Sequence, residues 1–268
     1  MRVAIDTQPG GAAPNEDWVG ATPTLAVVLD GLSTVGLDTG CHHGVPWYVA
    51  HLGSQLMAAL TDPGVSLKAG LASALERVAA LHPECDLANP GTPSATVAVL
   101  RQSQESFDYL VLADSPIVLE GNQGFSVITD LRVDQILPEL RAEVGRHENH
   151  TAEHEEALRR LVIAQRQTRN TATGYWVAAA SPEAAEYALT GSTPTQDLRA
   201  AALLSDGAAC LVTDYGMATW PEVFTVLRAG GPQELINNVR QVEATDPNGQ
   251  RWPRYKSGDD ASVAFCQR

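Results

Sequence analysis

Apolar and polar residues alternate along the chain in two kinds of pattern, which predict a mixture of strands and helices. Short segments rich in β-branched residues, bounded by turn formers, predict strands. They lie at residues 2–6, 24–29, 94–100, 107–113, 116–120, 124–128, 174–180, 200–205 and 261–266. Several are joined by short turns, such as 101–106 and 120–124. This spacing favours antiparallel hairpins.

Apolar residues at helical spacing predict helices at residues 45–61, 66–82, 151–169, 181–189, 219–229 and 232–243. Ser66 and Thr151 are suited to cap helix starts, and Pro182 and Pro221 fit a first helical turn, where no amide donor is needed. Strands and helices come in runs without strict alternation, which indicates an α+β fold. No internal repeat or low-complexity linker interrupts the chain. We therefore expect one domain spanning residues 1–268.

Composition narrows the classes of partner. The 268 residues are 44% hydrophobic, enough for a large core, and 32 acidic against 18 basic residues give a net charge of -14. A phosphate backbone or an anionic membrane surface requires a basic face. We therefore expect no nucleic-acid partner and no membrane partner.

The start of the chain has no signal-peptide core, and no segment reaches the ~20 apolar residues that cross a bilayer. These two observations predict a cytoplasmic protein.

The four cysteines, Cys41, Cys85, Cys210 and Cys266, have no C-x-x-C spacing and lie in different kinds of segment. This distribution indicates neither a zinc site nor a disulfide framework, so we expect free thiols.

Three acidic segments lie beside apolar runs: Val27–Gly31 with Asp30, Leu203–Gly207 with Asp206, and Gly258–Val263 with Asp259. Aspartates at the ends of neighbouring strands repel one another unless a cation lies between them. Hard oxygen donors without adjacent cysteine or histidine select Mg²⁺ or Mn²⁺. Two such ions, ~3.5–4 Å apart, activate a water for in-line attack on phosphorus. The pattern therefore predicts a phosphomonoester hydrolase.

The order of six segments resembles the PPM family, the metal-dependent type 2C protein phosphatases. The segments are Asn15–Asp17, Asp30–Gly31, Pro93–Ala98, Leu112–Ser115, Ser205–Gly207 and Asp259–Val263. The resemblance implies a four-layer αββα sandwich of two antiparallel sheets flanked by helices. It also implies a hydrolase acting on phosphoserine or phosphothreonine of proteins.

Carried over residue by residue, the resemblance implies a two-ion site with Mg²⁺ or Mn²⁺. Asp30 would bridge both ions, and the carbonyl of Gly31 would bind one of them. Asp206 and Asp259 would complete the shell of the other ion. Glu16 would hold a water of the metal shell, and Asp114 would face a possible third ion.

The chain also departs from the family pattern. Ala12, Ala13 and Pro14 stand where the family usually has a phosphate-binding arginine, and Cys210 replaces a second aspartate, which weakens the expectation of a third ion. His42 and His43 could return to the site to contact phosphate or to protonate the leaving alkoxide, and we take His43 as the catalytic candidate. Arg166 and Arg169 are alternative replacements for the missing arginine.

The same residues leave several roles open. Aspartates before glycine commonly cap turns, and either aspartate of the pair Asp259 and Asp260 could face the site. The substrate could be a small phosphorylated metabolite, or the chain could be a catalytically degenerate binding or regulatory protein. His150 and His154 match the H-x-x-E-H pattern of inverted zinc peptidases, but their surroundings are almost wholly polar, which indicates a solvated helix start.

Overall fold

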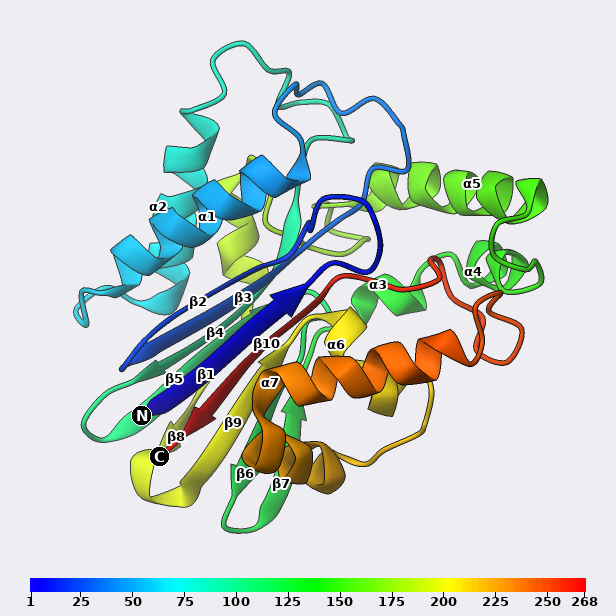
Figure 1. Cartoon of the computed structure of the whole chain (residues 1–268). Helices are drawn as coiled ribbons and strands as arrows, with labels where there is room; N and C mark the ends of the chain where they lie inside the picture. The colour runs from blue at the N-terminus through cyan, green and yellow to red at the C-terminus, as the bar shows by residue number, and fades with distance from the viewer.

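Two antiparallel five-stranded sheets stack face to face in the computed structural model, which describes residues 1–268 (Figure 1). The first sheet has the order β1-β10-β9-β6-β7. Its strands are β1 (Arg2–Gln8), β6 (Ile117–Gly121), β7 (Gly124–Ile128), β9 (Leu198–Leu204) and β10 (Ala261–Gln267). The second sheet has the order β2-β3-β4-β5-β8. Its strands are β2 (Trp18–Thr22), β3 (Leu25–Gly31), β4 (Ala95–Gln102), β5 (Ser106–Leu112) and β8 (Leu189–Pro194).

Strand β3 illustrates why the central strands are continuous apolar runs. Leu25, Val27 and Leu29 pack against the helices outside the sheet. Ala26 and Val28 pack between the two sheets, with residues of β9 and β10. Because successive side chains of a strand point to opposite faces, both faces of β3 must be apolar to be buried. The interior therefore has three apolar layers: one between the two sheets, and one beneath the helices on the outer face of each sheet.

Helices cover the outer face of each sheet (Figure 1). The pair α1 (Val45–Leu60) and α2 (Leu67–Ala79) packs on the second sheet. On the first sheet lie α6 (Asp206–Thr213) and α7 (Trp220–Ala244), and α7 bends at Gly231, where φ is 76° and Pro232 follows. No helix combines the length and apolarity needed to span a bilayer.

The connection between β7 and β8 forms a small subdomain at one end of the sheets (Figure 1). It contains α3 (Arg132–Gln135), α4 (Pro138–Val144) and α5 (Ala152–Thr168). The 3₁₀ helix η1 (Pro182–Tyr187) follows in the chain and packs with α1 and α2 on the second sheet. A second 3₁₀ helix, η2 (Thr195–Asp197), joins β8 to β9. The subdomain forms the outer wall of the cavity described below.

The predicted α+β sandwich is confirmed, but several predicted elements are wrong. Residues 174–180 form no strand: Tyr175 and Ala178 make only isolated bridges, although Tyr175 to Ala179 are buried. An apolar run can be buried as irregular chain, and periodicity alone does not separate the two cases. Residues 181–189 form η1 rather than an α-helix, and the next residues form β8. The pattern also missed β2, α3, α4 and α6.

Candidate active site

Asp30, Asp206 and Asp259 come together at one end of the sandwich. Asp30 lies on the face of β3 that carries Ala26 and Val28, so it points between the sheets. Asp206 begins α6 directly after β9, and Asp259 precedes β10, which is antiparallel to β9. The end of β9 and the start of β10 therefore lie at the same edge. All three carboxylates, with Gly31, line one cavity of about 800 Å³.

The three carboxylates are close enough to affect one another. The backbone amide of Asp206 donates to Asp30 Oδ2 at 3.3 Å. Burial raises the pKa of both Asp30 and Asp206 well above the usual range, and each feels the negative charge of Asp259. The proximity of the three carboxylates therefore disfavours their ionised forms when no cation is bound.

Asp259 and Asp260 have different surroundings. Asp260 accepts hydrogen bonds from the backbone amides of Gly10 at 2.8 Å and Glu16 at 2.6 Å, so its carboxylate holds the N-terminal loop. Asp259 lines the cavity and accepts from Lys256 Nζ at 2.6 Å. Of the pair, Asp259 is therefore the one that faces the other aspartates.

Two glycines allow the backbone to pack tightly beside these carboxylates. A Cβ on Gly31 would lie 2.3 Å from the carbonyl oxygen of Glu16, and one on Gly207 would lie 2.2 Å from that of Asp260. Both separations are far below van der Waals contact. The strand ends can approach one another only because these positions lack side chains.

Glu16 and Asp17 approach the cluster from the N-terminal loop. Glu16 accepts a short hydrogen bond from the hydroxyl of Ser33, a cavity residue, and burial raises its pKa. Asp17 is buried, and its Oδ2 has no hydrogen-bond partner. Burial raises the pKa of Asp17 to about 7, with Asp259 and Asp260 acting in the same direction and the hydroxyls of Ser205 and Ser262 opposing.

Asp114 lines the same cavity from the connection between β5 and β6. Thr129 Oγ1 donates a hydrogen bond to the backbone carbonyl of Asp114 at 3.1 Å, and not to its carboxylate. Burial raises the pKa of the Asp114 carboxyl to about 6, and the negative charge of Asp134 acts in the same direction. The thiol of Cys210 also lines the cavity and donates to the carbonyl of Gly207 at 3.1 Å.

Five cationic side chains line the cavity: Arg141, Arg166, Arg169, Arg254 and Lys256. Arg166 donates to the carbonyls of Asp38 at 3.0 Å and Thr34 at 3.3 Å, and Arg169 donates to Ser94 Oγ and the carbonyl of Pro90. Both arginines therefore hold neighbouring loops.

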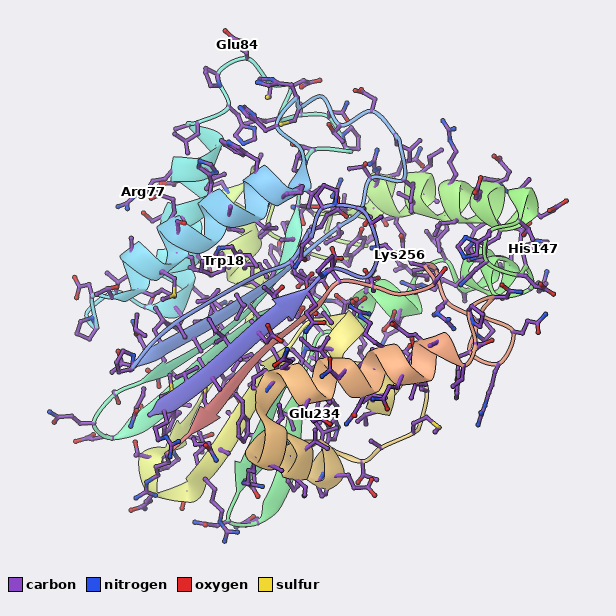
Figure 2. All side chains as sticks on the ribbon, viewed as in Figure 1. Trp18, Arg77, Glu84, His147, Glu234 and Lys256 are labelled. Carbon is purple, nitrogen blue, oxygen red and sulfur yellow. The ribbon has the colours of Figure 1, made fainter.

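Lys256 lies on the segment that leads into β10 (Figure 2). Burial alone would lower its pKa, but the charges of Asp259, Asp206 and Asp30 raise it. Lys256 was not among the site residues predicted from the sequence. The sequence feature that could have identified it is its position three residues before Asp259.

His43 does not lie among the residues that line the cavity. Its ring stacks on Trp47, with centroids 4.1 Å apart, and its Nδ1 lies 3.5 Å from Cys41 Sγ. His42 Nδ1 lies 3.5 Å from Cys85 Sγ. The structure thus places both histidines with cysteines rather than with the carboxylates.

The four cysteines are free thiols in the structure, as predicted, but two of them lie close together although they belong to different segments. Cys41 Sγ and Cys85 Sγ lie 3.4 Å apart, because two loops distant in sequence meet there. Cys210 and Cys266 are buried elsewhere.

The H-x-x-E-H segment forms no metal site. His150 precedes α5 with φ of 69° and contacts Ser257 Oγ at 2.6 Å, whereas His154 lies on the helix and contacts the carbonyl of Arg254 at 3.1 Å. The two imidazoles therefore have separate partners.

The donor set fits hard divalent ions. The cavity gathers the carboxylates of Asp30, Asp114, Asp206 and Asp259 with no histidine among its lining residues, and Asp17 Oδ2 nearby is buried without a partner. Oxygen donors of this kind select Mg²⁺ or Mn²⁺ over Zn²⁺.

Comparison with known proteins rests on three-dimensional structure. No family model matches the sequence, and no curated protein matches it. Among solved structures, the catalytic domain of the serine/threonine phosphatase PstP, crystallised with two manganese ions, is 16% identical with a TM-score of 0.58, over 99% of this chain and 97% of that one.

Two other bacterial proteins give similar values. Stp1, a serine/threonine phosphatase from Staphylococcus aureus, is 13% identical with a TM-score of 0.59, over 100% of this chain and 95% of that one. PppA from Pseudomonas aeruginosa is 17% identical with a TM-score of 0.59, over 100% of this chain and 97% of that one. The chain therefore has the fold of the PPM-type serine/threonine phosphatases.

Proposed function

We propose that the chain is a metal-dependent phosphomonoester hydrolase acting on phosphoserine or phosphothreonine of proteins. One observation carries this proposal: Asp30, Asp114, Asp206 and Asp259 line a single cavity at the end of a PPM-type sandwich. The fold alone does not require carboxylates at these positions. Their convergence from β3, the β5–β6 connection, α6 and the start of β10 supports a cation-dependent reaction.

In this proposal Asp30, the carbonyl of Gly31, Asp206 and Asp259 would hold two Mg²⁺ or Mn²⁺ ions. Asp114 lines the same cavity and would face a third ion, although Cys210 supplies no second carboxylate for it. When bound, the ions supply Lewis-acid activation of water and of the phosphoryl group. Glu16, fixed by Ser33, orients water at the edge of the cluster.

Lys256 is the group that we propose to bind the substrate phosphate in place of the absent arginine. An ammonium group has three donors, and Lys256 Nζ uses one of them on Asp259. Arg166 and Arg169 already donate to loop carbonyls, so they are less free to move toward a substrate. His43 has no part in this mechanism because it does not line the cavity.

The decisive experiment is hydrolysis of p-nitrophenyl phosphate by the full chain with Mn²⁺, with Mg²⁺, and after treatment with a chelator. The proposal predicts turnover with either ion and its loss on chelation. Absence of turnover at every metal concentration, in protein shown to be folded by circular dichroism, would contradict it. That result would favour a degenerate binding protein, for which the ion pair between Lys256 and Asp259 is the supporting observation.

A second candidate substrate class is a small phosphorylated metabolite. The cavity is walled by apolar side chains of the α4–α5 subdomain, including Val144, Leu158 and Val162, which suits a compact ligand. Competition against p-nitrophenyl phosphate separates the classes. Inhibition by phosphoserine and phosphothreonine peptides at lower concentration than by a panel of sugar and nucleoside phosphates supports the protein phosphatase, and the reverse order supports the metabolite enzyme.

A further inference from the structure

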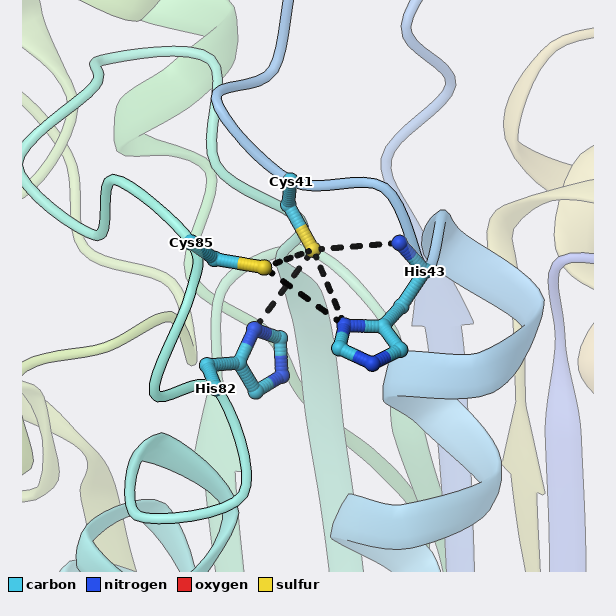
Figure 3. A group of neighbouring side chains, drawn as sticks. All are labelled: Cys41, His43, His82 and Cys85. Atoms are coloured by element: carbon cyan, nitrogen blue, oxygen red, sulfur yellow. Dashed lines mark hydrogen bonds between the residues drawn. The ribbon is translucent and has the colours of Figure 1, made fainter.

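Two thiols and two imidazoles meet outside the carboxylate cavity (Figure 3). Cys41 and His43 lie in the connection between β3 and α1, and His82 and Cys85 lie in the connection between α2 and β4. One ligand atom from each residue lies within 4.8 Å of the others. None of the four residues lines the carboxylate cavity. We refer to these four residues as the Cys/His cluster.

The spacing of these atoms matches a tetrahedral zinc shell. Cys41 Sγ lies 3.5 Å from His43 Nδ1 and 3.5 Å from His82 Nδ1, and Cys85 Sγ lies 3.6 Å from His43 Nδ1. Zinc binds thiolate at about 2.3 Å and imidazole at about 2.0–2.1 Å, so a regular tetrahedron has a sulfur–nitrogen edge of about 3.6 Å. The expected sulfur–sulfur edge is about 3.8 Å. The two sulfurs are 3.4 Å apart, slightly closer than that edge.

A disulfide or a set of simple hydrogen bonds accounts less well for the Cys/His cluster. A disulfide needs its sulfurs at about 2.05 Å, and these lie 3.4 Å apart. Thiols are weak hydrogen-bond donors, so contacts between sulfur and imidazole do little to stabilise the arrangement. His82 is buried, and the polar partner of its Nδ1 is the Cys41 thiol, at 3.5 Å. A buried imidazole nitrogen whose partner is so weak indicates that a stronger one, such as a metal ion, is missing at Nδ1.

The surroundings hold the side chains in place. Trp47 stacks on His43 and meets the ring of His82 edge-on, with centroids 4.1 and 4.7 Å apart. The two loops are also joined directly: the amide of Asp86 donates to the carbonyl of Gly40 at 2.8 Å, and Asn89 donates to Asp38 at 2.9 Å. The four ligands are therefore brought together by contacts that do not require the ion.

We propose that Cys41, His43, His82 and Cys85 bind one zinc ion in a closed structural site that joins the β3–α1 loop to the α2–β4 loop. Two soft thiolates with two imidazoles select zinc over Mg²⁺ or Mn²⁺. Four protein ligands complete the tetrahedral shell and leave no position for a substrate. The site therefore fixes loop positions and takes no part in hydrolysis.

The first test is the zinc content of the full chain, purified under reducing conditions from zinc-supplemented cells and measured by mass spectrometry of the metal. We expect one zinc per chain in the native protein and less than one tenth of that in the Cys41→Ser/Cys85→Ser variant. His147→Ala and Cys266→Ala are matched controls, each removing a histidine or cysteine that does not contact the cluster, and both should keep one zinc. Asp30→Asn should also keep it, which separates this site from the carboxylate site.

A second measurement needs no variant. Apoprotein titrated with Co²⁺ should develop thiolate charge-transfer absorption and the intense visible bands of tetrahedral cobalt, saturating at one equivalent and displaced by zinc. Absence of these bands would overturn the proposal, as would zinc retained in Cys41→Ser/Cys85→Ser. A Cys41–Cys85 disulfide in the zinc-supplemented protein, identified by peptide mass spectrometry, would overturn it as well.

Discussion

The carboxylate cavity and the Cys/His cluster are assembled in opposite ways. Asp30, Asp206 and Asp259 stand at the ends or starts of strands, so sheet register places them. The Cys/His cluster is carried by loops on either side of the α1–α2 helix pair, so loop contacts place it. Strand-end residues follow apolar runs that are visible in sequence, whereas loop residues are brought together only by the folded chain.

The two regions also differ in electrostatics. Burial and neighbouring charge raise the pKa of Asp30 and Asp206, so the carboxylates disfavour one another without a cation. Burial likewise raises the pKa of the Cys41 thiol, but a protonated thiol carries no charge and repels nothing. Loss of Mg²⁺ or Mn²⁺ should therefore increase repulsion among the carboxylates and abolish hydrolysis. Loss of zinc should instead reduce the order of the two loops that carry the Cys/His cluster.

The largest expected effect is that of Asp30→Asn on hydrolysis. Removing the proposed bridging charge should lower kcat/KM by about 10³-fold or more, since metal stabilisation of the transition state amounts to several kcal/mol. The measurement is p-nitrophenyl phosphate turnover with saturating Mn²⁺. Asp62→Asn, at an exposed turn where asparagine can still accept from the amide of Gly64, is the control and should be unchanged. Unchanged turnover in Asp30→Asn would remove Asp30 from the mechanism.

Gly207→Ala should disturb the carboxylate region through packing. The new Cβ would lie 2.2 Å from the carbonyl oxygen of Asp260 and 3.1 Å from Asp259 Cβ, so α6 must move away from the start of β10. We expect a loss of about 1–3 kcal/mol in the free energy of unfolding, measured by urea denaturation. Gly11→Ala meets nothing within 4 Å and serves as the control. Equal stability of the two variants would show that this tight approach is not required.

Lys256→Met tests the phosphate-binding half of the cavity. Loss of the ammonium group should raise KM for p-nitrophenyl phosphate by about tenfold, corresponding to about 1.4 kcal/mol, with a smaller change in kcat. Lys256→Arg keeps the charge and should recover part of the affinity. A fall in kcat at unchanged KM would instead assign Lys256 to the transition state or to the position of Asp259.

Strands that are buried on both faces were predicted from their continuous apolar runs, and the exposed edge strands β1 and β7 were predicted as well. Strand β3 was predicted at 24–29 and found at Leu25–Gly31, because five consecutive apolar residues are fully buried there. Strand β8 was missed because it is an exposed edge strand, Leu189–Pro194, whose polar residues carry no alternating pattern. Residues 174–180 were predicted as a strand because they are apolar, but they make only isolated bridges and do not pair with a neighbouring strand.

The candidate sites divide in the same way. Asp30, Asp206 and Asp259 were found because each adjoins a buried strand, and the structure places all three on one cavity. The pairing of Cys41-x-His43 with His82-x-x-Cys85 has no short-range spacing that marks a zinc site. It depends on how the chain returns after α1 and α2, which local patterns do not encode.

The smallest expected effect is that of Cys41→Ser/Cys85→Ser on hydrolysis, and it tests whether the two regions are independent. None of the four cluster side chains lines the cavity, although the loops that carry them do so at Leu32, Ser33, Val35 and Gly91. Arg166 and Arg169 also hold these loops, through the carbonyls of Asp38 and Pro90, and these contacts do not require zinc. We therefore expect kcat/KM with saturating Mn²⁺ to fall less than about tenfold, under 1.4 kcal/mol, in protein that remains folded. Thermal unfolding of the native protein should shift downward on zinc removal, and that of the variant should not respond to zinc. A loss of activity as large as that of Asp30→Asn, in folded variant, would mean that loop order set by the Cys/His cluster controls the geometry of the carboxylates, and the two regions would then form one functional unit.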